Sequence, residues 1–430
     1  MSHTISGDDG YSSGPYCAVM PEIAVTADAS ALGFDPGRLD RLDAHFKKYV
    51  DDGRLPGWSL AVARDGEIAH ASNYGWADIE AKRPLEGDAI FRIASMTKPI
   101  CGVAAMILWE EGMFELRDQV KWYVPSFADQ KVFRSGSTTN PRLDPVTEPM
   151  EMWHLFTHTA GLTYGFMYSH SVDQMYRNAG FEWGTPPDKD LAGICDMLAA
   201  LPLLFQPGTE WNYSMSIDVL GRVVEILSGM SLGEFMKKRI FDPLGMTDTA
   251  FFVPEDKMDR LAALYVMNPA DRKAMRMDAM GGRATSKPLA EMGGGGLVST
   301  MSDYMKFAMM LRNGGELNGA RILSPRTVSY MASNHLPDGA DLSEFGRPLF
   351  AETAFDGVGF GLTMSVTVDP VKAKVPGSVG DFGWGGAFST IFTVDPVEDL
   401  VYLFMTQLMP SSAHPIRPQF KQLVHQALVD

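Results

Sequence analysis

Ser95 and Lys98 are two residues of this 430-residue chain whose types and spacing could do chemistry together. Residues three apart on a helix share a face, so a hydroxyl and an ammonium group at these positions can meet. A serine hydroxyl is a weak nucleophile until a base takes its proton, and a lysine can be that base when burial or nearby positive charge lowers its pKa. The pair indicates acyl transfer, although such a spacing alone occurs about once by chance in a chain of this length.

Pro99 indicates where the helix begins. Proline is tolerated only in the first turn of a helix, where its missing N–H would have no partner in any case. The helix must therefore start close to Ser95, which places that serine at the positive end of the helix dipole. Free backbone N–H groups there can hold a negatively charged oxygen, so the N–H of Ser95 is a candidate oxyanion donor.

Tyr213, in the segment Trp211-Asn212-Tyr213-Ser214-Met215, could supply further proton chemistry. A phenol held near a cationic lysine can exist partly as phenolate, a base suited to abstracting a serine proton. The alternative is a core tyrosine whose hydroxyl is hydrogen-bonded. This segment alone does not decide between the two.

Further candidates for the site lie in the segment Trp384-Gly385-Gly386-Ala387, inside an apolar run. Two successive glycines weaken a strand and usually mark a close approach of the backbone to a ligand. A backbone N–H there, that of Ala387, could be the second oxyanion donor. A β-bulge is the alternative explanation of the two glycines.

Two other patterns are weaker candidates. The segment Gly10-Tyr11-Ser12-Ser13-Gly14 fits the G-x-S-x-G nucleophile elbow, but it lies in a polar arm with no buried strand before it. His154 and His158 have the i, i+4 spacing of a zinc site, but the residues between them include no glutamate that could act as a base. We therefore expect no metal.

The elements that must position these residues lie at both ends of the chain. The N-terminal part predicts a helix after Asp35-Pro36, a hairpin with strands over 58–63 and 68–74, and the helix that opens near Ser95. Similar patterns predict C-terminal elements: a helix over 302–311, strands over 360–368, 384–394 and 400–407, and an amphipathic helix over 418–429.

The middle of the chain differs from both ends. It is rich in loops and methionine, with helical patterns over 217–227 and 232–239. We expect an α+β fold with one antiparallel sheet, flanked by N- and C-terminal helices, and a mostly helical second domain. A site between two such domains is the default pocket. The predicted division is a flexible arm over 1–28, an α/β domain over 29–124 and 288–430, and a helical domain over 125–287.

Composition and charge exclude several classes of function. The formal net charge of −16 opposes a role in binding nucleic acid, which needs a basic face. No stretch approaches the roughly 18 apolar residues of a membrane span. The polar N-terminal segment lacks the features of a secretory signal, so we expect a cytoplasmic protein. The cysteines, which are Cys17, Cys101 and Cys195, form neither a metal pattern nor a disulfide framework.

In this order, the motifs resemble the serine β-lactamase and penicillin-binding-protein superfamily, above all its class C β-lactamases and family VIII carboxylesterases. Ser95 and Lys98 match the S-x-x-K motif, Tyr213 matches the Y-x-N or Y-S-x element, and Trp384-Gly385-Gly386 matches the K-T-G strand. Three further segments are similar to turns of that family: 155–162, 242–246 and 294–300. The resemblance covers about residues 30–428 and implies a β-lactamase-like fold.

Two departures from the β-lactamase pattern indicate the substrate. Trp384 stands where β-lactamases carry the Lys or His that helps bind the carboxylate of the drug, and Met215 stands where they carry an Asn that holds its amide side chain. Each lost charged hydrogen bond is worth about 1.5–3 kcal/mol. A W-G-G third motif is that of the family VIII esterases. The resemblance therefore implies a carboxylesterase for small, short-acyl esters, and leaves weak β-lactam turnover open.

The implied mechanism needs no cofactor. Ser95 attacks the ester, Tyr213 and Lys98 share the proton transfers, and the N–H groups of Ser95 and Ala387 receive the oxyanion. The predicted substrate-binding residues are Trp384, Gly385, Gly386 and Met215.

Two rival functions remain at this stage. The first is a β-lactamase or D-amino-acid peptidase, which a comparison of nitrocefin and ester turnover would distinguish. The second is a non-catalytic binding relative, whose expected signature is the loss of the serine, the lysine or the tyrosine. The sequence does not indicate the oligomeric state.

Overall fold

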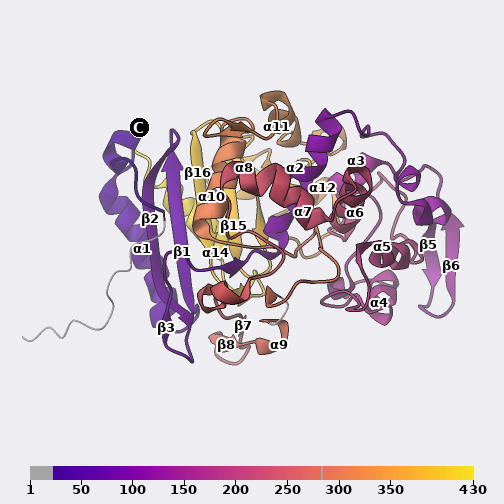
Figure 1. The fold of residues 1–430 in the computed structure, drawn as a ribbon, viewed down its shortest axis with the longest axis horizontal. Coiled ribbons are helices and arrows are strands. Elements are labelled where there is room, and N and C mark those ends of the chain that lie inside the picture. Colours follow the sequence, from indigo (N-terminus) through magenta and orange to yellow (C-terminus); the bar gives the residue numbers. More distant parts are fainter. Residues whose placement is uncertain (1–22, 282–283) are drawn as a thin grey trace, which may run out of the picture.

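An eight-stranded sheet built from both ends of the chain forms the centre of the computed structural model, which describes residues 23–281 and 284–430 (Figure 1). Every pair of neighbouring strands in it is antiparallel, which confirms the predicted sheet and the α+β class. In spatial order the strands are β12 (Val358–Phe360), β13 (Ser365–Thr367), β14 (Phe382–Gly386), β15 (Thr390–Asp395), β16 (Leu400–Met405), β1 (Gly57–Arg64), β2 (Glu67–Asp78) and β3 (Arg83–Pro84).

The two ends of the chain meet where β1 pairs with β16. Ser59 of β1 lies opposite Met405 of β16 on one side and Asn73 of β2 on the other. Both β1 and β16 are buried along nearly their whole length, as their apolar runs predict. A slip by one residue would exchange the two faces of a strand, so the apolar pattern fixes this register.

Two of the predicted strands are each a pair of shorter strands. The run 384–394 is interrupted after Gly386, and the chain turns through 387–389 before β15 begins, so the prediction of one strand there is wrong. Ser389 in this turn has a φ of 68°, which a strand cannot contain. The run 360–368 divides in the same way, at Thr363 with a φ of 73°. Apolar residues around both turns concealed them in the sequence.

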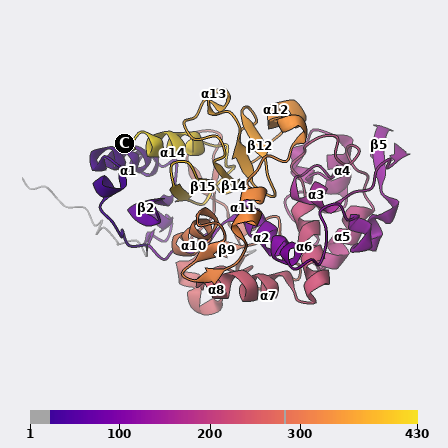
Figure 2. The ribbon, with the colours of Figure 1, turned by 90° about the horizontal axis from the view of Figure 1, so that it is seen from above.

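Helices α1 (Pro36–Asp51) and α14 (Ile416–His425) cover one face of the sheet and lie side by side (Figure 2). The Asp35 carboxylate accepts the N–H of Arg38 and so caps α1, whose buried stripe includes Leu39, Leu42 and Phe46. Helix α14 begins and ends earlier than the predicted range 418–429. After it the chain is held by bonds such as that from the N–H of Val429 to the carbonyl of Gly33.

The opposite face of the sheet is covered by α10 (Met301–Arg312), and α2 (Thr97–Glu110) lies between the sheet and the middle of the chain (Figures 1 and 2). Every residue of α2 from Thr97 to Leu108 is buried. A helix that is apolar on all sides must be surrounded by protein. The residues of its first turn, Thr97, Lys98 and Pro99, therefore lie in the interior of the molecule.

The middle of the chain contains β-hairpins as well as the predicted helices. Helix α7 (Leu232–Met236) continues as a π-helical turn over Lys237–Phe241, which covers the predicted helix 232–239. The other elements of this part are α3 (Met152–Phe156), α4 (Ser171–Asn178), α5 (Leu191–Ala199), α6 (Ser216–Ser228), α8 (Asp242–Leu244), α9 (Asp278–Gly281), β5 (Lys131–Gly136), β6 (Pro141–Pro145), β7 (Tyr265–Met267) and β8 (Ala274–Arg276). Short elements of the C-terminal part are β10 (Glu316–Leu317), β11 (Ala320–Arg321), α11 (Pro325–Met331), α12 (Leu342–Phe345), α13 (Pro370–Ala373) and β17 (Leu408–Met409).

The predicted N-terminal arm is described only in part. Residues 1–22, including the Gly10–Gly14 pattern and Cys17, lie outside the described residues. At Thr26 the chain contacts β2, where the N–H of Thr26 donates to the carbonyl of Ile68 at 3.0 Å. The division of the chain at 28, 124 and 287 stays a prediction.

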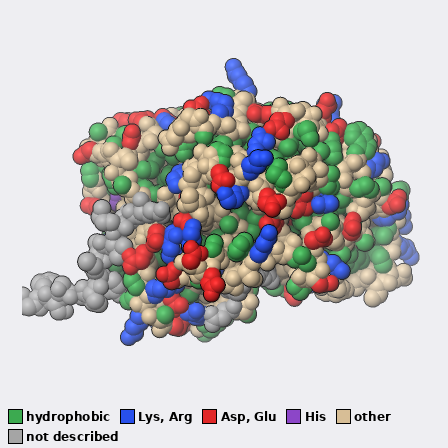
Figure 3. All heavy atoms as spheres, viewed as in Figure 1, with side chains coloured by type: hydrophobic (Ala, Val, Ile, Leu, Met, Phe, Trp, Pro, Cys, Tyr) green, Lys and Arg blue, Asp and Glu red, His purple; other side chains and the backbone are tan. Residues whose placement is uncertain are grey.

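The face of the molecule drawn in Figure 3 carries charges of both signs among hydrophobic side chains. Within residues 23–281 and 284–430, no helix is long and apolar enough to cross a membrane. The cytoplasmic location stays a prediction.

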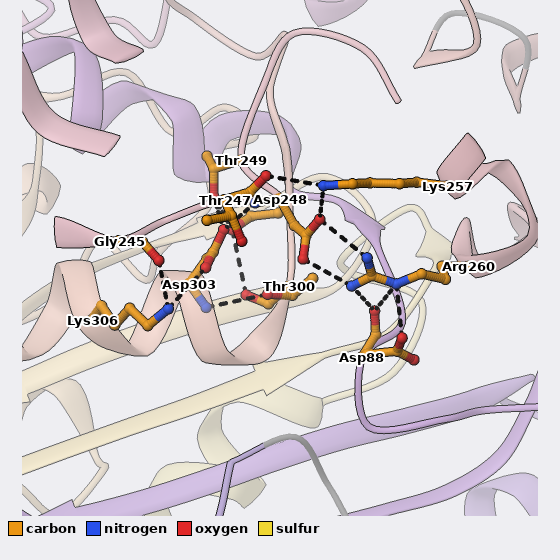
Figure 4. A network of polar contacts seen from close by, with 11 residues as sticks. Asp88, Gly245, Thr247, Asp248, Thr249, Lys257, Arg260, Thr300, Asp303 and Lys306 are labelled. Carbon is orange, nitrogen blue, oxygen red and sulfur yellow. Dashed lines mark hydrogen bonds and ion pairs between the residues drawn. The ribbon is translucent and has the colours of Figure 1, made fainter. Parts of the chain in front are cut away.

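A network of ion pairs holds the chain that returns from the middle region (Figure 4). The Arg260 guanidinium binds the carboxylate of Asp248, with contacts of 2.9 and 3.1 Å, and the carbonyl of Asp88. The N–H of Asp248 donates to Asp303 in the first turn of α10. The carbonyl of Arg260 accepts the N–H of Ile90, just before the strand that leads to Ser95. The network therefore anchors the approach to the candidate nucleophile.

Replacing Asp248 with alanine should lower the free energy of unfolding by about 2–3 kcal/mol, because it leaves the partly buried Arg260 and Lys257 without their shared carboxylate. Urea denaturation measures this change. Asp144→Ala is the matched control, since its ion pair with Arg134 is exposed and should contribute less than about 0.5 kcal/mol. Equal losses in the two variants would contradict the structural role of the network.

Candidate active site

Ser95 lies in a tight turn between a short strand and a buried helix. Strand β4 (Phe91–Arg92) pairs with β9 (Val298–Ser299), the chain makes a 3-10 turn over Ala94–Met96, and α2 begins at Thr97. Ala94 has a φ of 44°, which is uncommon for a residue with a side chain. The turn presents Ser95 at the start of α2 with 8% of its surface exposed, as Pro99 in the first turn of this helix predicted.

The Lys98 amine is buried beside the Ser95 hydroxyl. Its Nζ lies 3.2 Å from Ser95 Oγ and donates to the carbonyl of Gly294 at 2.5 Å. Lys98 has no exposed surface, and burial lowers its pKa from 10.5 to about 8 because the charged form loses hydration. An amine with this pKa is partly neutral near pH 8 and can then accept a proton.

Asp218 fixes the carbonyl that Lys98 contacts. Its Oδ1 accepts the N–H of Gly294 at 2.7 Å, and a Cβ atom at position 294 would lie 2.6 Å from this carboxylate. A glycine is therefore needed there. Burial raises the pKa of Asp218 to about 6, although the charge of Lys98 opposes the rise.

The Tyr213 hydroxyl donates to Ser95 Oγ at 2.6 Å. Burial, with the charge of Glu352 adding to it, raises the pKa of Tyr213 well above 10. The phenol is therefore protonated at neutral pH. Of the two alternatives left open for this tyrosine, the partial phenolate is disfavoured, because burial outweighs the charge of Arg417, which lowers the pKa. Lys98 Nζ lies 4.6 Å from the centroid of the Tyr213 ring.

Backbone contacts hold Tyr213 in place. The N–H of Asn212 donates to the carbonyl of His158 at 3.0 Å, and its side-chain amide donates to the carbonyl of Leu162 at 3.1 Å. The turn over 155–162 thus supports the tyrosine. Within it, His158 Nδ1 lies 3.1 Å from the hydroxyl of Ser214, and its ring packs against Tyr213.

A cavity of about 530 Å³ opens at Ser95. Ser95, Tyr213, Met215 and Ala387 all line it, so four of the predicted site residues converge from distant parts of the chain. Ala387 stands in the turn between β14 and β15. Most of the remaining lining is aromatic or apolar, including Tyr164, Phe166, Phe181, Trp183, Phe251, Phe350, Phe388, Met280 and Leu289.

The other predicted substrate-binding residues lie behind the cavity wall. Trp384 is buried, with its ring 5.5 Å from Tyr213 and 5.3 Å from Phe360. A Cβ atom at Gly385 would point to the face of the strand opposite to the Trp384 side chain, as the two-residue period of a strand requires. Neither these residues nor Gly386 lines the cavity. Trp384 therefore packs against the tyrosine, and its role in substrate binding stays a prediction.

The sequence did not single out three polar residues that line the cavity, Asp218, Glu352 and Ser411. Asp218 had a usable signal, because it is a charged residue among the apolar positions of a predicted helix. Glu352 and Ser411 lie in irregular segments, where no periodic pattern distinguishes a buried polar residue from an exposed one.

Comparisons with known proteins show which family and which structures this chain is similar to. The family model described as Beta-lactamase matches residues 42–426. Protein Rv1367c of Mycobacterium tuberculosis (strain ATCC 25618 / H37Rv) is 37% identical over 376 residues, which cover 86% of this chain and 90% of that protein. Esterase EstB of Burkholderia gladioli is 32% identical over 392 residues, which cover 89% and 94%. The structure of EstCE1, a hydrolase with promiscuous acyltransferase activity, superposes with a TM-score of 0.77 at 26% identity and covers 91% of this chain and 98% of its own.

The rate at which a fluorophosphonate labels Ser95 should rise with pH and reach half its maximum near pH 8. If Lys98 is the base, only its neutral amine can accept the serine proton, and burial brings the neutral form into this range instead of above pH 10. Labelling rates between pH 6 and 10 measure the midpoint. Lys98→Met should label slowly at every pH. A flat profile for the unmodified protein, or a midpoint near 10.5, would contradict the role of the buried amine.

Proposed function

The chain belongs to the β-lactamase family, and we propose that it is a carboxylesterase in which Ser95 is the nucleophile and Lys98 and Tyr213 transfer protons. Ester hydrolysis by a serine nucleophile agrees with its esterase and hydrolase relatives. These three roles are proposed because Ser95 Oγ lies 2.6 Å from the Tyr213 hydroxyl and 3.2 Å from the Lys98 amine.

Acylation begins with the neutral Lys98 amine. It takes the proton of Ser95 while Oγ forms a bond to the ester carbonyl carbon, and the carbonyl oxygen becomes an anion. The N–H groups of Ser95 and Ala387 receive this oxyanion. The bond to the alcohol then breaks, the leaving oxygen takes the proton of the Tyr213 phenol, and the proton on Lys98 restores the phenol. Water releases the acyl group through the same steps in reverse.

An uncharged substrate suits the lining of the cavity. The rings of Tyr164 and Phe166 stack at 4.6 Å, and those of Phe166 and Trp183 stack at 5.1 Å, so a column of three aromatic rings extends from the Lys98 amine. Trp183 at the end of this column is about half exposed. Apolar and aromatic side chains bind uncharged groups well. Removing apolar surface from water on binding lowers the free energy, and no unpaired charge is buried.

Replacing Ser95 with alanine should lower the rate of p-nitrophenyl butyrate hydrolysis at least about 1000-fold, because the acyl-enzyme can no longer form. Initial rates of the purified proteins measure this loss. Ser59→Ala is the control, since Ser59 is also buried but lies in β1 outside the cavity. If Ser95→Ala kept most of the activity, the nucleophile would be a different residue.

Short acyl chains should be preferred, and β-lactams should be poor substrates. We expect kcat/KM to be higher for p-nitrophenyl acetate and butyrate than for the dodecanoate, and to be at least about 100-fold lower for nitrocefin than for the butyrate. Trp384 and Met215 lack the polar groups that hold a β-lactam in the β-lactamases that this sequence resembles. Parallel assays on one enzyme preparation test both statements. Nitrocefin turnover above ester turnover would instead favour a β-lactamase.

A further inference from the structure

A second polar cluster, made of Ser411, Glu352 and Arg417, lies at the edge of the cavity. The Glu352 carboxylate accepts the Ser411 hydroxyl at 2.9 Å and Arg417 Nη2 at 2.5 Å. The Glu352 side chain is 1% exposed and that of Arg417 is 15% exposed. The mechanism above uses none of these three residues. A buried ion pair costs hydration, so its presence beside a reaction site needs an explanation.

The Arg417 guanidinium reaches from α14 to the turn between β14 and β15. Its Nη2 donates to the carbonyl of Gly386 at 2.8 Å and lies 3.3 Å from the carbonyl of Thr390, while Nη1 donates to the carbonyl of Glu352 at 2.8 Å. The carbonyl of Gly386 also accepts the N–H of Ser389 at 3.0 Å. Two donors thus hold this one carbonyl at the end of β14.

The carbonyl of Gly386 and the N–H of Ala387 belong to the same peptide group. A trans peptide is planar, so its C=O and N–H point in opposite directions, and fixing one fixes the other. Ala387 lines the cavity together with Ser95. Holding the Gly386 carbonyl from behind therefore sets the direction of the Ala387 N–H.

We propose that Arg417 is a positioning residue for the oxyanion hole, which acts through the Gly386–Ala387 peptide and is itself held by Glu352 and Ser411. This inference rests on the proposed function, in which the Ala387 N–H receives the oxyanion. A hydrogen bond from a charged donor to the carbonyl is strong and also polarises the amide, which makes its N–H a better donor.

The two glycines of the Trp384-Gly385-Gly386 segment agree with this arrangement. A Cβ atom on Gly385 would lie 2.3 Å from Arg417 Cζ, so any side chain there would push the guanidinium away. A Cβ atom on Gly386 would lie 2.4 Å from the carbonyl oxygen of Ile93, two residues before Ser95. The glycines thus bring the guanidinium and the nucleophile turn close to opposite sides of one strand.

Arg417→Met tests the proposal, because methionine keeps an apolar stem and removes the donor. Loss of one whole oxyanion donor costs about 100- to 1000-fold in kcat. Loss of its orientation should lower kcat for p-nitrophenyl butyrate about 10- to 100-fold, with KM changed less than about 3-fold. Phenylboronic acid, which forms a tetrahedral adduct with an active serine, should bind more weakly by a similar factor. Active-site titration corrects each rate for the fraction of folded enzyme.

Arg312→Met is the matched control. Its side chain is 17% exposed, close to the value for Arg417, and it pairs with Asp399 away from the cavity. It should leave kcat and the affinity for phenylboronic acid unchanged. Arg417→Met with unchanged kcat per active site and unchanged boronate affinity would overturn the proposal and leave Arg417 a purely structural role.

Two further variants keep the test decisive if Arg417→Met does not fold. Arg417→Lys keeps a charged donor and should retain more of kcat than methionine does. Glu352→Gln keeps the shape of the side chain but weakens its hold on the guanidinium, and should lower kcat several-fold at constant KM. An unchanged kcat in both variants would contradict the proposal. Failure of the proposed function is distinguishable, because it would show as an unmodified enzyme that does not hydrolyse esters or as full activity of Ser95→Ala.

Discussion

Burial of the Lys98 amine is the constraint on which the rest of the site depends. An ammonium group without exposed surface loses hydration, and the resulting fall of its pKa to about 8 makes a base available to the serine three residues before it. Helix α2, which is buried from Thr97 to Leu108, brings the amine inside, and the Gly294 carbonyl, which Asp218 fixes, accepts a hydrogen bond from it there. The same burial raises the pKa of Tyr213, and in the proposed mechanism the tyrosine therefore donates a proton where the lysine accepts one. Burial thus shifts the pKa values of the Lys98 amine and the Tyr213 hydroxyl in opposite directions, although both groups contact Ser95 Oγ.

The topology explains how residues so far apart in sequence surround that oxygen. The pairing of β1 with β16 joins the two ends of the chain in one sheet, and β14 of that sheet contacts the turn before α2. The middle of the chain contributes Tyr213 and Met215, and its return path is anchored by the ion pairs around Asp248. The cavity forms where these three parts meet. The family fold provides this meeting point, whereas the residues that line the cavity, most of them apolar or aromatic, are those on which the proposed preference for uncharged esters rests.

Local and periodic signals made part of this arrangement predictable from the sequence. The Ser95–Lys98 spacing, the helix start marked by Pro99 and the apolar runs of β1 and β16 all depend on neighbours in the chain. The turn at 387–389 was not predicted, because Ala387 and Phe388 continue an apolar run and only the φ of Ser389 shows the break. The contact between Glu352 and Arg417 joins positions 65 residues apart in two segments without a common pattern, so only the folded chain could show it. Gly385 was noticed for the right physical reason, a close approach to backbone, but a guanidinium and not a ligand makes that approach.

Trapping the acyl-enzyme tests the central claim, that the Ser95 hydroxyl forms the covalent intermediate, most directly. The protein would be mixed with p-nitrophenyl butyrate, quenched in acid within milliseconds, digested and analysed by mass spectrometry. We expect a butyryl group on the peptide that contains Ser95, with fragment ions that place it on that serine, and its absence from the same peptide of Lys98→Met at the same time point. A butyryl group on another residue, or hydrolysis at the full rate with no acylated peptide, would contradict that claim.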